Sequence, residues 1–141
     1  MALRLTQEEY NALLGISKKS KETKYHSQQI TVGGKTFDSV KEGTRYSELV
    51  LAERAGEISE LRCQVPYELI PAQREPDKIG PRGGVKKGKL IEQACYYIAD
   101  FVYKDKNGKE IVEDTKGCRT PDYIIKRKLM LFVHKIRIKE T

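Results

Sequence analysis

The strongest constraint on the fold is a turn signal between two segments with strand-like sequence. Asp105-Lys106-Asn107-Gly108 separates residues 94–104 from residues 109–116, and aromatic and β-branched residues recur in the flanking segments. An Asn-Gly pair between two such segments predicts a β-hairpin. We therefore expect an antiparallel strand pair in the C-terminal half of the chain.

The register of this hairpin decides which side chains meet. A two-residue Asn107-Gly108 turn would send Asp100 and Asp114 to opposite faces of the sheet, because side chains alternate along a strand. A three-residue loop, residues 106–108, with Gly108 in the left-handed bulge position, opposes Asp100 with Asp114 and brings their Cβ atoms to about 5 Å. We predict the three-residue loop.

That register would gather two carboxylates and an ammonium group, because Lys116 follows Asp114 by two residues and shares its face. Carboxylate oxygens are the ligands that Mg²⁺ and Mn²⁺ prefer. A lysine ammonium stabilises the negative charge that develops on a reacting phosphate. Asp100 and Asp114 are thus candidate metal ligands, and Lys116 is a candidate catalytic residue for phosphodiester hydrolysis. Asp-x-Lys alone is common by chance, so its context has to carry this interpretation.

The charge of the chain favours a polyanionic partner. It contains 27 Lys and Arg against 20 Asp and Glu, a formal net charge of +7. The basic residues cluster in residues 74–90 and 116–141, on either side of the acidic pair. One such cluster alone could be a solvated face, but two favour nucleic acid. The candidate DNA contacts are Arg119, Lys126, Arg127, Lys86, Lys87 and Lys89.

The N-terminal region is expected to be separate from the domain. Residues 1–27 predict a short helix, from the capping-box pattern at Thr6 to about Leu14, followed by a basic linker that includes Lys18, Lys19, Lys21 and Lys24. The linker is interpreted as a mobile tether, with a DNA-contacting arm as the alternative. Residues 28–141 predict one domain, because the chain is too short for two of ordinary size.

Within that domain the boundaries predict an ordered series of elements. Ser39 starts a helix that Gly56 stops, and Thr120-Pro121 starts another. The Pro-, Gly- and Lys-rich residues 71–90 predict an exposed loop or long hairpin inserted between two strands. The expected ranges are a hairpin at 30–37, a helix at 39–55, strands at 58–70, 94–104 and 109–116, a helix at 120–133 and a strand at 135–139.

The order helix, strand, strand, strand, helix, strand resembles the core of the PD-(D/E)xK nuclease superfamily. A narrower similarity links residues 24–141 to a small family of phage nuclease-like proteins, some of which are associated with Holliday-junction resolution. The sequence departs from the superfamily motif at Ala99, where proline would stand. The similar segments are Phe37-Asp38-Ser39, Glu42, Arg45-Tyr46, Glu48-Leu49, Tyr97-Ile98-Ala99-Asp100-Phe101 and Val112-Glu113-Asp114-Thr115-Lys116-Gly117.

The resemblance implies a restriction-endonuclease-like α+β fold, with helices flanking a mixed sheet. It also implies an endonuclease that uses Mg²⁺ or Mn²⁺ to hydrolyse DNA, with branched or junction DNA in phage recombination or replication as the expected substrate. Paired cuts in a junction would imply a homodimer. The competing interpretation is a non-catalytic DNA-binding or phage assembly protein that keeps the fold.

Four further polar residues have open roles. Glu42 is the helix acid that the resemblance assigns to the site, although closing a capping box with Ser39 explains it about equally well. Glu48 is an alternative helix acid, and Gln64 is either a site residue or an exposed strand residue. Glu113 should point away from Asp114, as a solvent-facing or second-layer residue, and would replace it as a ligand only at a bulge.

The location of the protein follows from what the sequence lacks. It has no apolar run of roughly 20 residues and no secretory signal pattern. Its three cysteines are too scattered for a zinc site or a disulfide framework. We therefore expect a cytoplasmic protein without membrane contact, in the host cytoplasm if the chain is phage-encoded.

Overall fold

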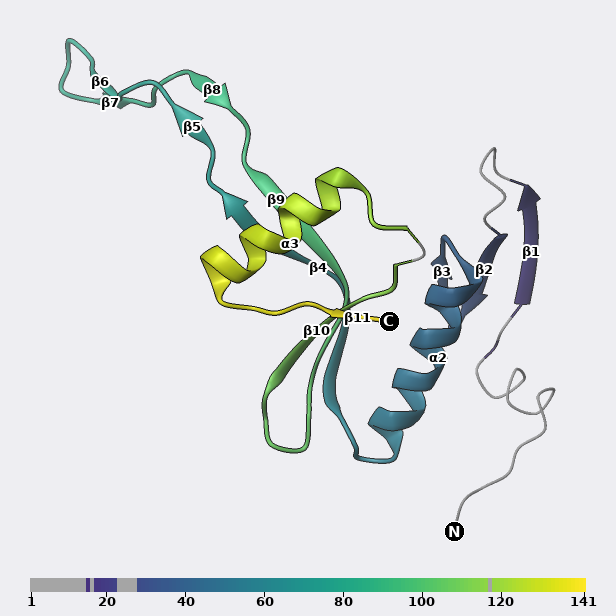
Figure 1. The fold of residues 1–141 in the computed structure, drawn as a ribbon. Helices are drawn as coiled ribbons and strands as arrows, with labels where there is room; N and C mark the ends of the chain where they lie inside the picture. Colours follow the sequence, from purple (N-terminus) through teal and green to yellow (C-terminus); the bar gives the residue numbers. More distant parts are fainter. Residues whose placement is uncertain (1–14, 16, 23–27, 117) are drawn as a thin grey trace.

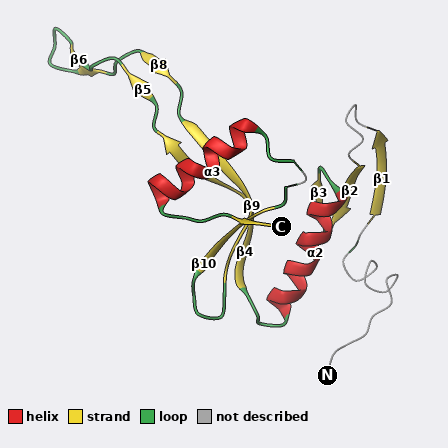
Figure 2. Cartoon of the chain, in the orientation of Figure 1, coloured by secondary structure: helices red, strands yellow, loops and turns green. Residues whose placement is uncertain are grey.

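The computed structural model describes Gly15 and residues 17–22, 28–116 and 118–141. These residues form an α+β fold with a mixed central sheet and two helices (Figures 1 and 2). The elements are β1 (Ser17–Glu22), β2 (Gln28–Val32), β3 (Lys35–Phe37), α2 (Val40–Arg54), β4 (Ser59–Ile70), β5 (Gln73–Arg74), β6 (Lys78–Ile79), β7 (Val85–Lys86), β8 (Leu90–Glu92), β9 (Cys95–Lys104), β10 (Glu110–Asp114), α3 (Pro121–His134) and β11 (Lys139–Glu140).

The central sheet has the strand order β11-β10-β9-β4. β4, β9 and β10 pair antiparallel, whereas β11 runs parallel to β10. α2, β4, β9, β10, α3 and β11 follow one another in the predicted order. β4 lies at an edge of the sheet, where Pro66, which has no N–H to donate, is tolerated.

The N-terminal prediction was wrong for part of the linker. Ser17–Glu22 forms β1, which pairs antiparallel with β2 in a small three-stranded sheet. Strand pairing uses main-chain groups, so the free edge of β2 can recruit a segment of polar composition. The predicted helix at residues 6–14 and Lys24 lie outside the described residues.

The β2–β3 hairpin and α2 form where the turn and capping residues predicted them. Gly33 and Gly34, with φ of 55° and 81°, form the two-residue turn between β2 and β3. Ser39 caps α2 by accepting a hydrogen bond from the Glu42 N–H at 3.1 Å. Gly43 lets α2 approach β2 closely, because a Cβ there would lie 2.6 Å from Ile30 Cδ1.

The hairpin between β9 and β10 has the predicted register. Val112 pairs with Val102, and Gly108 has a φ of 77°. The Asp105 N–H donates to the Lys109 carbonyl at 2.9 Å, which closes the three-residue loop. Continuing this ladder by one pair past Glu113 opposes Asp114 with Asp100.

The C-terminal elements are shifted slightly from their predicted positions. Thr120 caps α3, and Pro121 is its first residue, as expected. The last strand begins at Lys139 rather than Lys135, because Lys135 adopts a left-handed conformation, with a φ of 59°, at the end of α3. No helix within the described residues is long and apolar enough to cross a membrane.

Two hydrophobic clusters lie on either side of the sheet. The cluster beside α2, here the α2 cluster, contains Ile30, Val32, Phe37, Leu49, Phe101 and Tyr103. The cluster beside α3, here the α3 cluster, contains Leu69, Tyr97, Ala99, Val102, Val112, Tyr123 and Met130. Figure 1 shows the two helices on opposite sides of the strands.

β4 packs against different clusters before and after Gln64. Leu61 and Cys63 pack against the α2 cluster, whereas Val65 and Tyr67 pack against the α3 cluster, although side chains two residues apart normally share a face. Gln64 has a φ of 52°, a left-handed conformation that interrupts the alternation. The strand thus changes face at this residue.

β9 makes the same change of cluster beside Asp100. Phe101 belongs to the α2 cluster and Ala99 to the α3 cluster. Because Cys63 pairs with Phe101 and Val65 with Ala99, Asp100 lies at the level of Gln64. We call this place the β4–β9 bend. It puts polar side chains where neither cluster covers the sheet completely.

Beyond the bend, β4 and β9 lead into a long hairpin arm, residues 71–92. Its short ladders are β5 with β8 and β6 with β7. Figure 1 shows the arm extending away from the sheet and helices. The predicted insertion is thus a hairpin.

Glu113 is buried rather than solvent-facing, which corrects one of the two roles expected for it. Its side chain is 0 % exposed and forms a bidentate ion pair with Arg45 of α2, whose Nε and Nη2 donate to the two carboxylate oxygens. Tyr103 donates a further hydrogen bond at 2.5 Å. Burial alone would raise the pKa of Glu113, but the bonds from Arg45 and Tyr103 outweigh it and lower that pKa.

Replacing Arg45 by methionine should strongly destabilise the fold. Arg45→Met leaves the buried Glu113 carboxylate without its counter-charge, a loss of about 3 kcal/mol in the free energy of unfolding. Glu48→Gln is the matched control, since it removes the exposed partner of the same arginine and should cost less than about 1 kcal/mol. Urea unfolding at pH 7 measures both, and equal losses would contradict a structural role for the Glu113 pair.

Candidate active site

Asp100, Asp114 and Lys116 come together beside the β4–β9 bend. Asp114 is buried at the end of β10, and Lys116 Nζ lies 3.3 Å from its Oδ1. Asp100 is half-buried, and its Oδ2 accepts a hydrogen bond from the Thr115 N–H at 2.9 Å. The Lys116 ammonium also lies over the Tyr123 ring, 4.5 Å from the ring centre. The predicted register therefore produces the predicted convergence.

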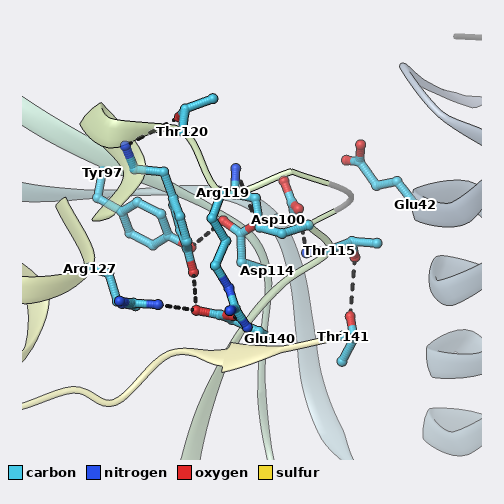
Figure 3. A network of polar contacts seen from close by, with 12 residues as sticks. Glu42, Tyr97, Asp100, Asp114, Thr115, Arg119, Thr120, Arg127, Glu140 and Thr141 are labelled. Carbon is cyan, nitrogen blue, oxygen red and sulfur yellow. Dashed lines mark hydrogen bonds and ion pairs between the residues drawn. The ribbon is translucent and has the colours of Figure 1, made fainter. Parts of the chain in front are cut away.

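The two oxygens of Asp114 have unequal surroundings (Figure 3). Oδ2 accepts a hydrogen bond from the Tyr97 hydroxyl at 2.5 Å. Oδ1 is buried and has no hydrogen-bond partner among the described residues, although the Lys116 ammonium forms an ion pair with it. A buried carboxylate oxygen without a hydrogen bond is costly, so this atom has capacity for a further ligand.

Glu42 directs its carboxylate toward the bend rather than back to its own helix cap. The backbone N–H of Glu42 is bonded to Ser39, but its Oε1 accepts a hydrogen bond from Gln64 Nε2 at 3.1 Å. Among the described hydrogen bonds, the return bond from the Ser39 N–H that would complete a capping box is absent. In Figure 3, Glu42 projects from α2 toward the side where Asp100 and Thr115 lie.

The carboxylates influence one another's protonation. Burial raises the pKa of Glu42 to about 7, with help from the charges of Asp100, Asp38 and Asp114, while Lys116 opposes the rise. Burial also raises the pKa of Asp100 to about 6, against the hydrogen bond from Thr115 and with a further contribution from Asp114. A bound cation would reduce the electrostatic repulsion between these crowded, partly desolvated carboxylates.

The donor set at this place fits a magnesium-like ion. Its groups are hard carboxylate oxygens, and one of them, Asp114 Oδ1, has no hydrogen bond within the described part of the chain. No group of three or more His, Cys, Asp or Glu side chains within the described parts of the chain is arranged to hold a metal ion. Mg²⁺ commonly binds through only one or two carboxylates and fills its other positions with water and phosphate.

Other predicted residues have different partners. Glu48 is bonded to Arg45 at 2.8 Å and so takes no part in the grouping at the bend. Arg119 and Arg127 both form ion pairs with Glu140, at 2.5 and 2.9 Å. Two of the predicted DNA contacts are therefore partly neutralised.

The remaining predicted contacts lie on two separate elements. Lys126 is half-buried on α3. Lys86, Lys87 and Lys89 are exposed on the arm. The structure thus divides the predicted DNA-contact set between the area around α3 and the arm.

Two residues near the bend were absent from the predicted set. Tyr97 bonds Asp114, and Lys41 Nζ donates to the Lys116 carbonyl at 3.2 Å. Regular alternation would put Tyr97 on the face opposite Asp100 and Asp114, so only the change of face in β9 explains its contact. Lys41 had a detectable signal, because it directly precedes Glu42 at the start of a predicted helix.

Glu42→Gln should stabilise the metal-free protein at high pH. The folded pKa of Glu42, about 7, exceeds its ordinary value of 4.5, so the unfolded chain binds fewer protons between these values and stability falls as pH rises through this window. The substitution removes this loss. In EDTA the variant should melt above the wild type at pH 8 and close to it at pH 4. A constant difference across this range would contradict the raised pKa, and Glu48→Gln is the control.

Comparison with known proteins identifies a family but no activity. No curated protein matches the chain, and no solved structure matches it. Residues 22–139 match a family described as "Protein of unknown function (DUF1064)", which covers well over half of the chain. The chain therefore belongs to the DUF1064 family of proteins of unknown function.

Proposed function

We propose that the chain is a divalent-metal-dependent DNA endonuclease with its active site at the β4–β9 bend. The observation that carries this proposal is the grouping of Asp100, Asp114 and Lys116, with a buried Asp114 oxygen that accepts no hydrogen bond from any described residue. Glu42 and Gln64 lie beside this grouping. The left-handed backbone of Gln64 adds support, because strained residues concentrate at functional sites.

Each residue has a role in this proposal. Asp100 and Asp114 would hold Mg²⁺ or Mn²⁺, and the ion would supply Lewis acidity and a bound water of lowered pKa. The Lys116 ammonium binds the phosphate and offsets the negative charge that develops on it. Glu42 orients the attacking water and accepts its proton, with Gln64 holding the carboxylate in place.

The substrate assignment rests on charge and on the resemblance to phage nuclease-like proteins. Phosphate contacts from the basic residues would give affinity without much discrimination between sequences. Branched or junction DNA is the proposed substrate, which places the reaction in phage recombination or replication. Paired cuts in a junction require two active sites and hence a homodimer.

A non-catalytic DNA-binding or phage assembly protein is the second candidate. One observation favours it: Asp100, Asp114 and Glu42 each accept a hydrogen bond from the protein, as carboxylates with a structural role would. Cleavage and binding assays on the same variants separate the two candidates.

Asp114→Asn and Lys116→Ala should each abolish cleavage, or reduce it by at least about a hundredfold, because each removes charge from the reacting centre. Binding to the same DNA without metal should change by less than a few fold. Duplex, nicked, flap and four-way-junction substrates, with Mg²⁺ or Mn²⁺, measure this. Lys106→Ala, in the exposed β9–β10 turn, is the control and should cleave normally. Lack of metal-stimulated cleavage by the wild type on all four substrates would overturn the proposal.

Mg²⁺ and Mn²⁺ should raise the melting temperature of the wild-type protein at pH 8, because a ligand that binds only the folded state stabilises it. Asp114→Asn should lose this shift, since it removes a ligand charge, whereas Lys116→Ala should retain it. Differential scanning fluorimetry across a metal titration measures this. A shift of equal size in the wild type and Asp114→Asn would place metal binding elsewhere.

A further inference from the structure

The hairpin arm has a defined shape although it lacks a hydrophobic core of its own. The Glu75 N–H donates to the Lys89 carbonyl at 2.9 Å, and the Gly88 N–H donates to Asp77 Oδ1 at 2.8 Å. A Cβ at Gly88 would collide with the Glu75 carbonyl oxygen, so the two sides of the arm touch there. Arg74 also donates to the Gly88 carbonyl, at 3.2 Å. These bonds hold the arm as a ribbon.

The arm carries an excess of unpaired positive charge. Residues 74–90 contain six basic residues and only two acidic ones, Glu75 and Asp77. None of the six forms an ion pair with a carboxylate of the described residues, whereas Arg119 and Arg127 do. Lys78 pairs directly with Lys86 across β6 and β7. Like charges in this position repel, and a polyanion would relieve the repulsion.

The far end of the ribbon also carries an uncovered apolar pair. Ile79 and Val85 oppose each other across the ladder and are 80 % and 72 % exposed. Adjacent strand residues point to opposite faces, so this pair lies on the face opposite Lys78 and Lys86. The end of the arm is therefore a narrow ribbon with one apolar face and long cationic side chains on the other.

We propose that the arm binds in the major groove of duplex DNA. A two-stranded ribbon fits that groove, which is about 12 Å wide. Ile79 and Val85 pack against base edges, where thymine methyl groups offer apolar contact. The flexible lysine and arginine side chains reach the phosphates on the groove walls. This inference rests on the proposed function, because it takes DNA as the substrate of the site at the bend.

The geometry adds a distance between the two contacts. The arm follows directly from β4 and β9, the strands that carry Gln64 and Asp100. At roughly 3.3 Å per residue, the chain from Gln64 to Ile79 spans at most about 50 Å. A turn of duplex is about 34 Å long, so the arm can contact DNA up to about one and a half turns from the cleaved bond. A substrate that touches both the bend and the arm therefore has duplex beside the cut.

DNA fits the arm better than a second copy of the same arm does. Two arms side by side would bring together two sets of unpaired cations at short range, which is unfavourable. The phosphates of DNA supply the opposite charge, and the groove covers the apolar pair. The two occupants give different results in one set of measurements.

Binding in EDTA tests the arm independently of cleavage. The probe is a fluorescent duplex of about three helical turns, measured by anisotropy over a range of salt concentrations. Lys78→Gln with Lys86→Gln should lower the slope of log affinity against log salt by about two. Ile79→Ser with Val85→Ser should weaken binding about tenfold and leave the slope unchanged, because it removes only apolar contact.

A matched control lies elsewhere on the surface. Lys106→Gln with Lys109→Gln changes two exposed lysines of the β9–β10 turn and should bind DNA like the wild type.

Two results would overturn the arm proposal. The first is that both arm variants bind the duplex with the affinity and salt dependence of the wild type. The second is that the arm variants change only the sedimentation of the protein without DNA, which would show that the arm contacts another copy of the protein. A wild type that never cleaves DNA would overturn the proposed nuclease instead, and the metal-free binding result would still stand.

Discussion

The β4–β9 bend is the feature on which the rest of the structure depends. Regular strands would present one continuous face to each helix. Here Cys63 and Phe101 pack against the α2 cluster, whereas Val65 and Ala99, two residues away on the other side of the bend, pack against the α3 cluster. The cost is a left-handed backbone at Gln64, an unfavourable conformation for a residue with a side chain. The gain is a position between the clusters where polar side chains remain accessible.

Glu113 and Asp114 show how one strand end can separate structural from reactive acidity. Adjacent strand residues point in opposite directions, so the two carboxylates lie in different environments. Arg45 and Tyr103 satisfy Glu113 fully inside the α2 side of the fold. On the other side, one oxygen of Asp114 accepts no hydrogen bond from the residues that the structure describes. The buried ion pair therefore anchors α2 to β10, next to the residue that the proposed chemistry uses.

Much of the fold could be predicted because its boundaries are local. Glycines with positive φ set the β2–β3 and β9–β10 turns, Ser39 and Thr120 cap the helices, and the hairpin register follows from its loop. The recruitment of β1 and the change of face at Gln64 could not be predicted, since both depend on distant packing. The contact between Tyr97 and Asp114 follows from that change, so it was missed as well.

The continuity of the arm with β4 and β9 has a consequence for how this family can vary. The arm follows directly from β4 and β9, which carry the bend, so the lengths of these strands help to set the distance between the arm and the bend. Side chains keep their faces only when a strand changes length by an even number of residues. An insertion of two residues in each strand would lengthen the distance between the arm and the bend by about 7 Å. An insertion of one residue would turn the apolar face of the arm to the opposite side. The distance between the arm and the bend would therefore change in steps of two residues per strand.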